Sequence, residues 1–463
     1  MNSPLTKTPI LPMTFSLKFV RTACVSVGMF CFNAAASLPP IEWFTALVGS
    51  NEQAAGEALD KIERGWHPSA TALLVESLPF SAGANTSRQI LTVLKRKTNA
   101  PLEKDMNALF EWLWQEKRPE HPDYTAFKAA IFSPIDERFQ EHFAASPVSL
   151  IRFDEIRWGG VRRDGIPPLK NPKMIAAKEA KWLHDDHVVF GVALNGDARA
   201  YPKRILAWHE MFKDRIGGSE VAGVYCTLCG ALVLYDVKHA GVTHELGTSG
   251  FLYRSNKLMY DHATKSLWST LEGTPVVGPL VNQGIALATL PVVTTTWKEW
   301  RARHPETQVL SLDTGHERDY SEGAAYRDYF ATDRLMFTVP KRDTRLKNKD
   351  EVLAIRNVQA PYDPLAISAA YLKKHPVHHI RVGARDFVVF TDASGANRVF
   401  ETRGERFTKW DGKASATDRR GRVWALTEAQ LTRAGAAPLP RASAHRAFWF
   451  GWIAQFPTTR LVK

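Results

Sequence analysis

The chain has 463 residues, 44% of them hydrophobic, and a formal net charge of +12 at neutral pH. This length and composition are typical of a globular protein with a sizeable core and roughly two to four domains. The basic residues are dispersed, apart from two short runs at 341–349 and 419–422, and no nucleic-acid-binding motif accompanies them. The charge therefore indicates a solvated basic surface, and a nucleic-acid site is not expected.

Residues 1–36 have the pattern of a secretion signal. Lys18 and Arg21 precede an apolar stretch at 22–32 that is too short to span a bilayer. We predict cleavage after Ala36 and a periplasmic or secreted mature protein, with an uncleaved membrane anchor as the alternative. No later segment approaches the roughly 18 apolar residues of a membrane span, so the mature protein is not expected to be integral to a membrane.

Residues 37–150 are predicted to be helical, because apolar residues recur there at helical spacing. The clearest stretches are Ala54–Ile62, Thr71–Leu78, Gln89–Leu94 and 109–113. Paired short helices favour a HEAT-like stack, and an irregular helical cap fits the same spacing equally well. This helical region is where we expect an unknown protein partner to bind.

A β-rich domain is predicted over residues 151–332. Its first elements are a helix at Met174–Leu183, a strand at Val188–Leu194 and a hairpin turn at 195–197. The sequence of short strands and turns that follows continues to the end of the domain.

A second helix is predicted to begin near Pro202, which suits a first helical turn, and to run to about Arg215. Ile205 and His209 fall on one face of that helix. Because the next strand follows directly, we expect this face to pack on it and to bring His209 towards the residues at the end of the strand.

The most informative residues are Cys226 and Cys229, which remain as the only cysteines once the signal is removed. The run 224–235 is typical of a strand, a tight turn and a second strand. Gly230 allows the backbone to curl beneath the pair and to present both sulfurs on one side. The chemistry of this turn is therefore soft-metal ligation, thiol redox exchange or a small disulfide.

An internal repeat is predicted from the tryptophans. Trp297 matches Trp449 and Trp300 matches Trp452. The offset is 152 residues in both cases, from 449 − 297 and 452 − 300. A proline and a threonine follow each pair at the same offset. Two similar units are therefore expected to follow one another along the chain.

In the second unit, residues 333–463, the strand and turn near 387–395 resemble those around the cysteines. Thr391 and Ser394 take the places of the two cysteines in that alignment. We predict an α+β protein in which an N-terminal all-α, HEAT-like region precedes a duplicated β-rich domain, and the second copy lacks the thiols. The cysteines are then not needed to build the unit.

The leading hypothesis for the site is metal binding by Cys226, Cys229 and His209. Thiolates with imidazole suit Cu(I) or Zn(II), and copper is favoured by compartment and ligand softness. The candidates for a fourth ligand are Met259, His262, His244 and water. Such a centre would serve metal handling or metal-dependent redox chemistry.

Two further hypotheses use the same cysteines. In the first, Cys226 and Cys229 are the redox residues of a thiol-disulfide oxidoreductase, and a nearby His209 lowers a thiol pKa. In the second, the protein is a non-catalytic binding protein, and the pair forms a static disulfide that stabilises little because its loop is short. The sequence does not decide among the three.

Three ordered groups of residues resemble those of a known family. They are 200–202 with His209-Glu210 and 225–230; 247–253 with 255–256, 259–261 and 266–268; and 278–279 with 297–300, 314–315 and 318–320. On these motifs the chain resembles the secreted prokaryotic family catalogued as domain of unknown function 3179, over roughly residues 154–463. The resemblance implies an extracytoplasmic protein and supplies no reaction. Thr227 stands where members of that family usually have proline.

Overall fold

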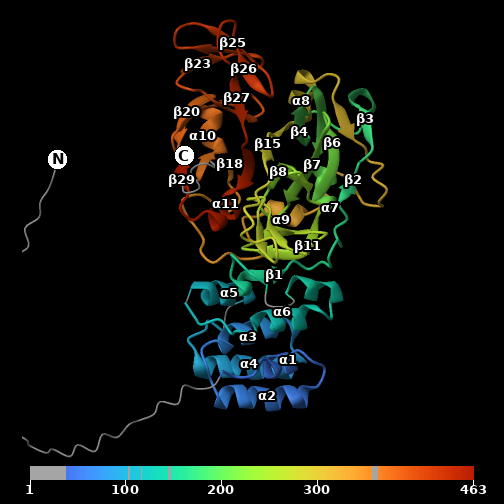
Figure 1. Cartoon of the computed structure of the whole chain (residues 1–463), viewed down its shortest axis with the longest axis vertical. Coiled ribbons are helices and arrows are strands. Elements are labelled where there is room, and N and C mark those ends of the chain that lie inside the picture. Colours follow the sequence, from blue (N-terminus) through green and yellow to red (C-terminus); the bar gives the residue numbers. More distant parts are fainter. Residues whose placement is uncertain (1–37, 103–104, 116, 144–146, 357–362) are drawn as a thin grey trace, which may run out of the picture. The chain divides into compact units, whose positions relative to one another are not determined.

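The computed structural model describes residues 38–102, 105–115, 117–143, 147–356 and 363–463 (Figure 1). The predicted secretion signal and its two cysteines lie outside these ranges. Helices and extensive β-sheets are both present, so the α+β class is confirmed. The described residues belong to one compact unit, Leu38–Lys463, and the predicted boundaries within it stay predictions.

Helices α1 to α6 occupy the N-terminal part, as the spacing of apolar residues predicted. Their bounds are α1 Ile41–Ala46, α2 Glu52–Arg64, α3 Ala70–Ser77, α4 Ala84–Lys97, α5 Met106–Gln115 and α6 Tyr124–Phe132. In α2 the Asn51 side chain accepts a hydrogen bond from the backbone N–H of Ala54 and so caps the helix. Leu59 and Ile62 of the same helix are buried in the core that the helices share. The HEAT-like character of this region stays a prediction.

The helical part packs directly on the first strands of the β-rich part. The Phe132 ring of α6 lies 5.0 Å from the Phe251 ring, between centroids. The indole N–H of Trp114 donates to the Asp154 carbonyl at 3.0 Å, and the Lys128 ammonium donates to the Ile156 carbonyl at 2.7 Å. These contacts place the helices against the sheet that contains Phe251.

That sheet has the strand order β1-β11-β12-β13-β14. Its strands are β1 Ile156–Trp158, β11 Leu246–Tyr253, β12 Asn256–Asp261, β13 Leu267–Ser269 and β14 Pro275–Val277. A neighbouring hairpin consists of β9 Lys238–His239 and β10 Val242–Thr243. Short 3-10 helices lie at Leu78–Phe80, Glu137–His142, Phe153–Glu155 and Ala177–Glu179.

A second sheet, in the order β15-β8-β7-β6-β2, carries the two cysteines. Its strands are β2 Leu169–Lys170, β6 Met211–Ile216, β7 Ser219–Cys226, β8 Ala231–Asp236 and β15 Thr289–Leu290. Strand β7 lies between β6 and β8 and is antiparallel to both. Because β7 is a central strand and is buried over most of its length, the turn at its end is held in a fixed position.

A third sheet has the order β16-β4-β5-β17-β3. Its strands are β3 Met174–Ala176, β4 Val188–Leu194, β5 Asp197–Pro202, β16 Val293–Thr296 and β17 Gln308–Leu310. Helix α7, Lys203–His209, follows β5, and helix α8, Trp297–Arg303, connects β16 to β17. The predicted strand and hairpin turn are confirmed, since Asn195 and Gly196 adopt positive φ between β4 and β5.

The C-terminal half contains two sheets, in the orders β28-β18-β19-β29 and β20-β21-β22-β27-β26-β25-β24-β23. The first is made of β18 Glu351–Ile355, β19 Leu365–Ser368, β28 His445–Phe448 and β29 Arg460–Val462. The second is made of β20 Val377–Val382, β21 Arg385–Thr391, β22 Asn397–Glu401, β23 Phe407–Trp410, β24 Ser415–Asp418, β25 Val423–Leu426, β26 Gln430–Thr432 and β27 Leu439–Ala442. The helices of this half are α10 Ala369–Lys374 and α11 Trp449–Gln455, and α9 Arg327–Ala331 precedes it.

The sheets β16-β4-β5-β17 and β28-β18-β19-β29 share their strand directions. In each, the first two pairs are antiparallel and the last pair is parallel. In each, a short helix that begins with a tryptophan connects the outer strands. This correspondence supports the predicted duplication, which stays a prediction. The four tryptophans of the two helices are 0% exposed, as expected for core residues.

One predicted helix is wrong, and a second begins as predicted but ends early. Met174–Leu183 begins instead with β3, because Ile175 pairs with Val309 of β17. The helix expected to reach Arg215 ends at His209, since Glu210 adopts a left-handed backbone with φ 54°. Residues 211–216 then form β6 and pair with β7, so the hydrogen bonds of a central sheet replace those of a helix.

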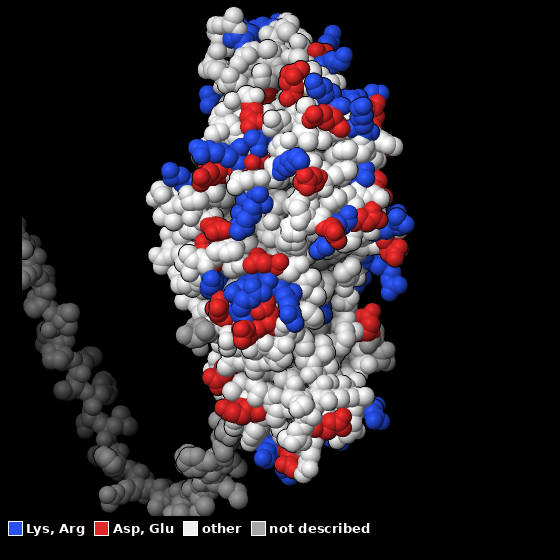
Figure 2. All heavy atoms as spheres, turned by 90° about the vertical axis from the view of Figure 1, so that its right-hand side faces the viewer, with Lys and Arg blue, Asp and Glu red and all other residues white. Residues whose placement is uncertain are grey.

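Figure 2 shows basic and acidic side chains interspersed over the face it presents, without a large area of one sign. Dispersed charge of this kind fits a solvated surface. None of the helices in the described ranges combines the length and the apolar run that a membrane span requires.

Burial makes the stability of the C-terminal half depend on pH. It lowers the pKa of His445 in β28 to about 4 from its usual 6.5. Between these values the unfolded chain binds a proton that the folded chain does not, so stability falls as the pH drops through this window. His445 should contribute a loss of about 3 kcal/mol at pH 4, so His445→Phe should lose less stability than the wild type by about this amount in urea unfolding between pH 7 and pH 4. The same substitution at exposed His184 should leave the pH dependence unchanged; equal curves for His445→Phe and the wild type would contradict the prediction.

Candidate functional site

The two cysteines lie in a tight turn between two buried strands, as predicted. Cys226 is the last residue of β7 and is joined to Cys229 by a disulfide, with their Cα atoms 5.3 Å apart. The Cys229 N–H donates to the Cys226 carbonyl at 3.1 Å and closes the turn. Gly230 has φ 60°, and a Cβ atom there would lie 2.9 Å from the Phe448 ring. The glycine is therefore required both by the turn and by the C-terminal half that packs on it.

Oxygen atoms surround the Cys229 sulfur. Asn256 Oδ1 lies 2.8 Å from Cys229 Sγ, and the Ser255 carbonyl oxygen lies 3.5 Å away. The Asn256 amide is oriented by its Nδ2, which donates to the Gly451 carbonyl at 2.9 Å. A thiol donates a hydrogen bond and a disulfide sulfur has no proton to donate. The surroundings of Cys229 therefore complement its reduced form.

Helix α11 of the C-terminal half closes the other side of Cys229. A Cβ atom on Gly451 would lie 2.9 Å from the Cβ atom of Cys229, so only glycine allows this approach. The Phe448 N–H donates to the Cys229 carbonyl at 2.7 Å. As a result Cys229 is fully buried and has no path to solvent of its own.

Cys226, in contrast, lines a cavity of about 70 Å³. This volume is roughly that of two water molecules and suits a group the size of a thiol side chain. Polar groups reach the cavity from Glu210, Thr227, Lys257 and Tyr326, and its remaining walls are largely apolar. Both cysteines are buried, at 1% and 0% exposure, and Cys226 alone of the two borders this cavity.

Glu210 organises the polar side of that cavity. Its carboxylate accepts hydrogen bonds from Lys257 Nζ at 3.0 Å, from Thr227 Oγ1 at 2.6 Å and from the Tyr326 hydroxyl at 3.1 Å. Burial lowers the pKa of Lys257, and Glu210 opposes that shift. Burial and Glu210 both raise the pKa of Tyr326. The carboxylate therefore fixes the cysteine turn through Thr227 and neutralises a buried lysine.

His209 contacts other residues than the cysteines. Its Nδ1 hydrogen-bonds the Pro167 carbonyl at 2.9 Å and its Nε2 hydrogen-bonds the Tyr320 hydroxyl at 2.5 Å. The Tyr320 hydroxyl continues to Thr314 Oγ1 at 2.6 Å. Burial lowers the pKa of His209, which favours its neutral form. Because the chain turns left-handed directly after it, His209 faces this loop and its neighbour Glu210 faces the cysteine turn.

The candidates for a fourth ligand have partners of their own. His244 Nδ1 lies 3.2 Å from Asp261 Oδ2, and His262 Nδ1 lies 3.4 Å from the Tyr260 hydroxyl. Met259 is fully buried in the apolar core that includes both cysteines. Within the described ranges, no three His, Cys, Asp or Glu residues are grouped so that they could hold a metal ion. The predicted three-ligand set is therefore not assembled in the disulfide form, and metal binding stays a prediction.

Sequence reasoning missed the residues that contact the turn. Glu210 and Asn256 stood within the quoted motifs, but Lys257 and Tyr326 did not, and none of them was assigned to the cysteines. The signal that was available was the position of Glu210 directly after His209 at the end of a short helix. Spacing along the chain could not connect Lys257 or Tyr326 to this carboxylate.

The Glu210–Lys257 pair sits in a buried position, where Glu210 is 8% and Lys257 is 6% exposed. Glu210→Gln leaves the lysine without a counter-charge and should cost about 3–5 kcal/mol of unfolding free energy. The double variant with Lys257→Met should recover a large part of this loss, because no buried charge remains. Urea unfolding at pH 7 measures both.

Asp313→Asn, which breaks the exposed pair with Lys173, serves as the control and should cause no measurable change. Equal losses in the single and the double variant at Glu210 and Lys257 would contradict the prediction.

Comparison with known proteins places the chain in a family. Neither the curated proteins nor the solved structures that were compared contain a significant match. The model of one family, described as protein of unknown function (DUF3179), matches residues 163–459. This match includes the cysteine turn, Glu210, Asn256 and Lys257, and it confirms the resemblance found in the motifs. The chain belongs to the DUF3179 family.

Proposed function

We propose that Cys226 and Cys229 form a redox-active pair that exchanges its disulfide with thiols of a partner molecule. The observation that carries the proposal is the position of Asn256 Oδ1, 2.8 Å from Cys229 Sγ and held by the bond of Asn256 to Gly451. This oxygen gains a hydrogen bond only when Cys229 is a thiol. Interactions that stabilise the reduced form make a disulfide a stronger oxidant.

The two sulfurs have different roles in the exchange. Cys226 borders the cavity, so an incoming thiol attacks its sulfur, and buried Cys229 is the leaving group. The S–S bond breaks, a mixed disulfide forms between Cys226 and the partner, and Cys229 takes the proton that the attacking thiol gives up. A second thiol then attacks the partner sulfur, which releases an oxidised partner and a reduced Cys226.

Glu210 and Lys257 prepare the turn for this chemistry. The hydrogen bond from Thr227 to Glu210, at 2.6 Å, fixes the residue that follows Cys226. Lys257 borders the same cavity as Cys226, and its ammonium is held there by the ion pair with Glu210 at 3.0 Å. The cavity admits a side-chain-sized group, so the partner is a small thiol or an exposed cysteine of an extended peptide.

The other expectations of the sequence fit this proposal. The predicted signal at residues 1–36 would direct the protein to an extracytoplasmic compartment, where an unliganded cysteine pair tends to be oxidised. The HEAT-like helices would offer a surface for a protein partner, and the duplicated domain would supply the C-terminal half that encloses Cys229. Copper or zinc binding by the reduced pair is the alternative, since two thiolates suit either ion.

Single cysteine variants test the proposal. Cys229→Ser leaves the cavity-lining thiol and should react with 5,5′-dithiobis(2-nitrobenzoate) and retain a mixed disulfide with glutathione. Cys226→Ser leaves only the enclosed thiol and should react at least about tenfold more slowly. The two variants are matched controls for each other, and mass spectrometry with a thiol count gives the result.

Three outcomes contradict the redox proposal. Equal reactivity of the two variants would remove the assigned roles. A wild-type disulfide that dithiothreitol cannot reduce in the folded protein would leave a static bridge. Near-stoichiometric copper or zinc in protein purified without chelator, lost in Cys226→Ser, would establish the metal alternative instead.

Asn256 is expected to set the reduction potential. Asn256→Leu removes the acceptor for the Cys229 thiol, a loss of about 1 kcal/mol for the reduced form. The potential should therefore become more negative by about 20 mV for this two-electron couple. Equilibration with glutathione buffers measures it. Ser249→Ala removes the buried bond to the Leu258 carbonyl and touches neither sulfur, so it should leave the potential unchanged. An unchanged potential in Asn256→Leu would contradict the prediction.

A further inference from the structure

A second cavity lies on the other side of the cysteine turn, between the two halves of the β-rich part. Its volume is about 120 Å³, and Tyr225 and Gly230 border it from the N-terminal half. Ser394 and Arg446 border it from the C-terminal half. Tyr225 directly precedes Cys226, so this cavity and the one beside Cys226 flank the same turn.

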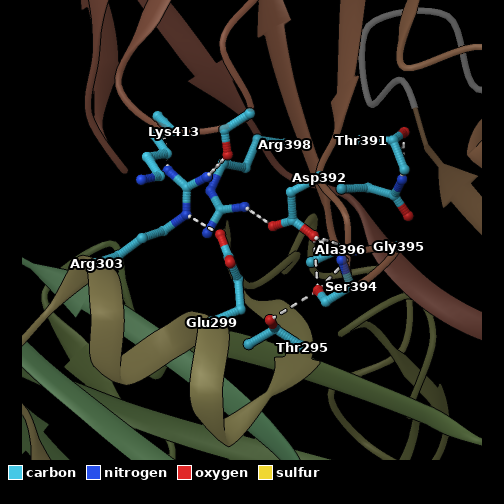
Figure 3. Close-up of polar contacts among 12 residues, drawn as sticks. Thr295, Glu299, Arg303, Thr391, Asp392, Ser394, Gly395, Ala396, Arg398 and Lys413 are labelled. Carbon is cyan, nitrogen blue, oxygen red and sulfur yellow. Dashed lines mark hydrogen bonds and ion pairs between the residues drawn. The ribbon is translucent and has the colours of Figure 1, made fainter.

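The wall at Ser394 is rigid. The Ser394 hydroxyl donates to Asp392 Oδ1 at 2.6 Å and faces Thr295 Oγ1 of β16 at 3.2 Å (Figure 3). Asp392 also accepts from the Ala396 N–H at 3.0 Å and from Arg398 Nη1 at 2.9 Å. The hydroxyl and amide groups of this wall are therefore occupied, and the cavity shape does not depend on a ligand.

Arg446 is also fully engaged. Its Nη1 donates to Glu351 Oε2 at 2.8 Å, its Nε to Asn397 Oδ1 at 2.7 Å and its Nη2 to the Gly395 carbonyl at 2.5 Å. Glu351 in turn is the carboxylate that borders the cavity. This pair cancels in charge, and each of the three guanidinium nitrogens donates one of these bonds.

Two donors at the cavity have no such partner. The Tyr225 side chain is 0% exposed, and its hydroxyl forms no hydrogen bond within the part of the chain that the structure describes. An unpaired buried hydroxyl is costly, so a ligand that accepts a hydrogen bond from it would be stabilised in this cavity.

Lys203 is the second unused donor. Among the described residues its ammonium forms no hydrogen bond or ion pair, and it lies over the Phe330 ring at 4.4 Å from the centroid. Burial lowers its pKa, and the charge of Glu351 opposes that shift. Lys203 is partly exposed, and the one carboxylate at this cavity is already paired with Arg446, so the ammonium is available to a ligand in the cavity.

We propose that this cavity binds a small monocarboxylate, which accepts hydrogen bonds from Lys203 and from the Tyr225 hydroxyl. The charges at the cavity are those of Lys203, Arg446 and Glu351, which leave one net positive charge for a singly charged anion. The volume corresponds to roughly four water molecules and fits a ligand of the size of acetate. The proposal is independent of the redox chemistry of the cysteines.

The experiment uses the full chain and acetate as the probe, with sodium chloride at equal ionic strength as the reference. Acetate should raise the melting temperature saturably, and calorimetric titration should give one site per chain. Lys203→Met and Tyr225→Phe should each weaken the affinity at least about tenfold. Tyr225→Phe should not lower the melting temperature without acetate, because it removes an unpaired hydroxyl.

Lys238→Met, at an exposed position of β9, should bind acetate like the wild type. Acetamide, which has the same shape without the charge, should not bind. The absence of a saturable shift with acetate in the wild type would overturn the proposal. Wild-type affinity in both Lys203→Met and Tyr225→Phe would overturn it as well.

Discussion

The enclosure of Cys229 by the C-terminal half is the constraint on which the site depends. The Phe448 N–H bonds the Cys229 carbonyl at 2.7 Å, and α11 approaches the cysteine so closely that only glycine fits at Gly451. The Gly451 carbonyl also orients the Asn256 amide that faces the sulfur. Three segments far apart in sequence therefore meet at one side chain. Their meeting makes the two cysteines unequal, although both belong to one turn of four residues.

A single left-handed residue separates two polar networks. Glu210 ends α7 with φ 54°, so its side chain and that of His209 leave the backbone in different directions. His209 joins Tyr320 in the loop that follows β17, and Glu210 joins Thr227 and Lys257 beside the cysteines. A longer helix would have kept both residues on helical turns. Because α7 ends early, Glu210 rather than His209 contacts the residues of the cysteine turn.

The parts of the fold that the sequence predicted are those governed by local pattern. Helix α2 follows from its apolar spacing, and the β4–β5 hairpin follows from Asn195 and Gly196. The strands on either side of the cysteines followed from the run 224–235. The sequence predicts that the helix continues to about Arg215, and only the pairing of residues 211–216 with β7 decides for a strand. Strand pairing is a long-range property, and spacing along the chain does not contain it.

Less of the site than of the fold could be predicted, because the site also depends on contacts between segments that are far apart in the sequence. The cysteine pair is evident from the sequence. The prediction that His209 is its partner depends on a helix that continues past residue 209, and α7 ends there. Lys257 and Asn256 reach the turn from β12, which is paired with β11 in another sheet. Their distance along the chain from the cysteines does not indicate that they contact this turn. Their roles emerge only when the two sheets are packed against one another.

The turn at Thr391–Ser394 is the predicted counterpart of the cysteine turn and contains no cysteine. There Asp392 accepts hydrogen bonds from the Ser394 and Ala396 N–H groups, both at 3.0 Å, and holds the turn closed. Arg398, which is 0% exposed, donates to Asp392 at 2.9 Å (Figure 3). It also donates to Glu428 at 2.7 Å and so joins the two carboxylates. A carboxylate and a buried arginine therefore supply the order that a disulfide gives to the other turn. A disulfide across so short a loop adds little stability, which fits the exchange that we propose for Cys226 and Cys229.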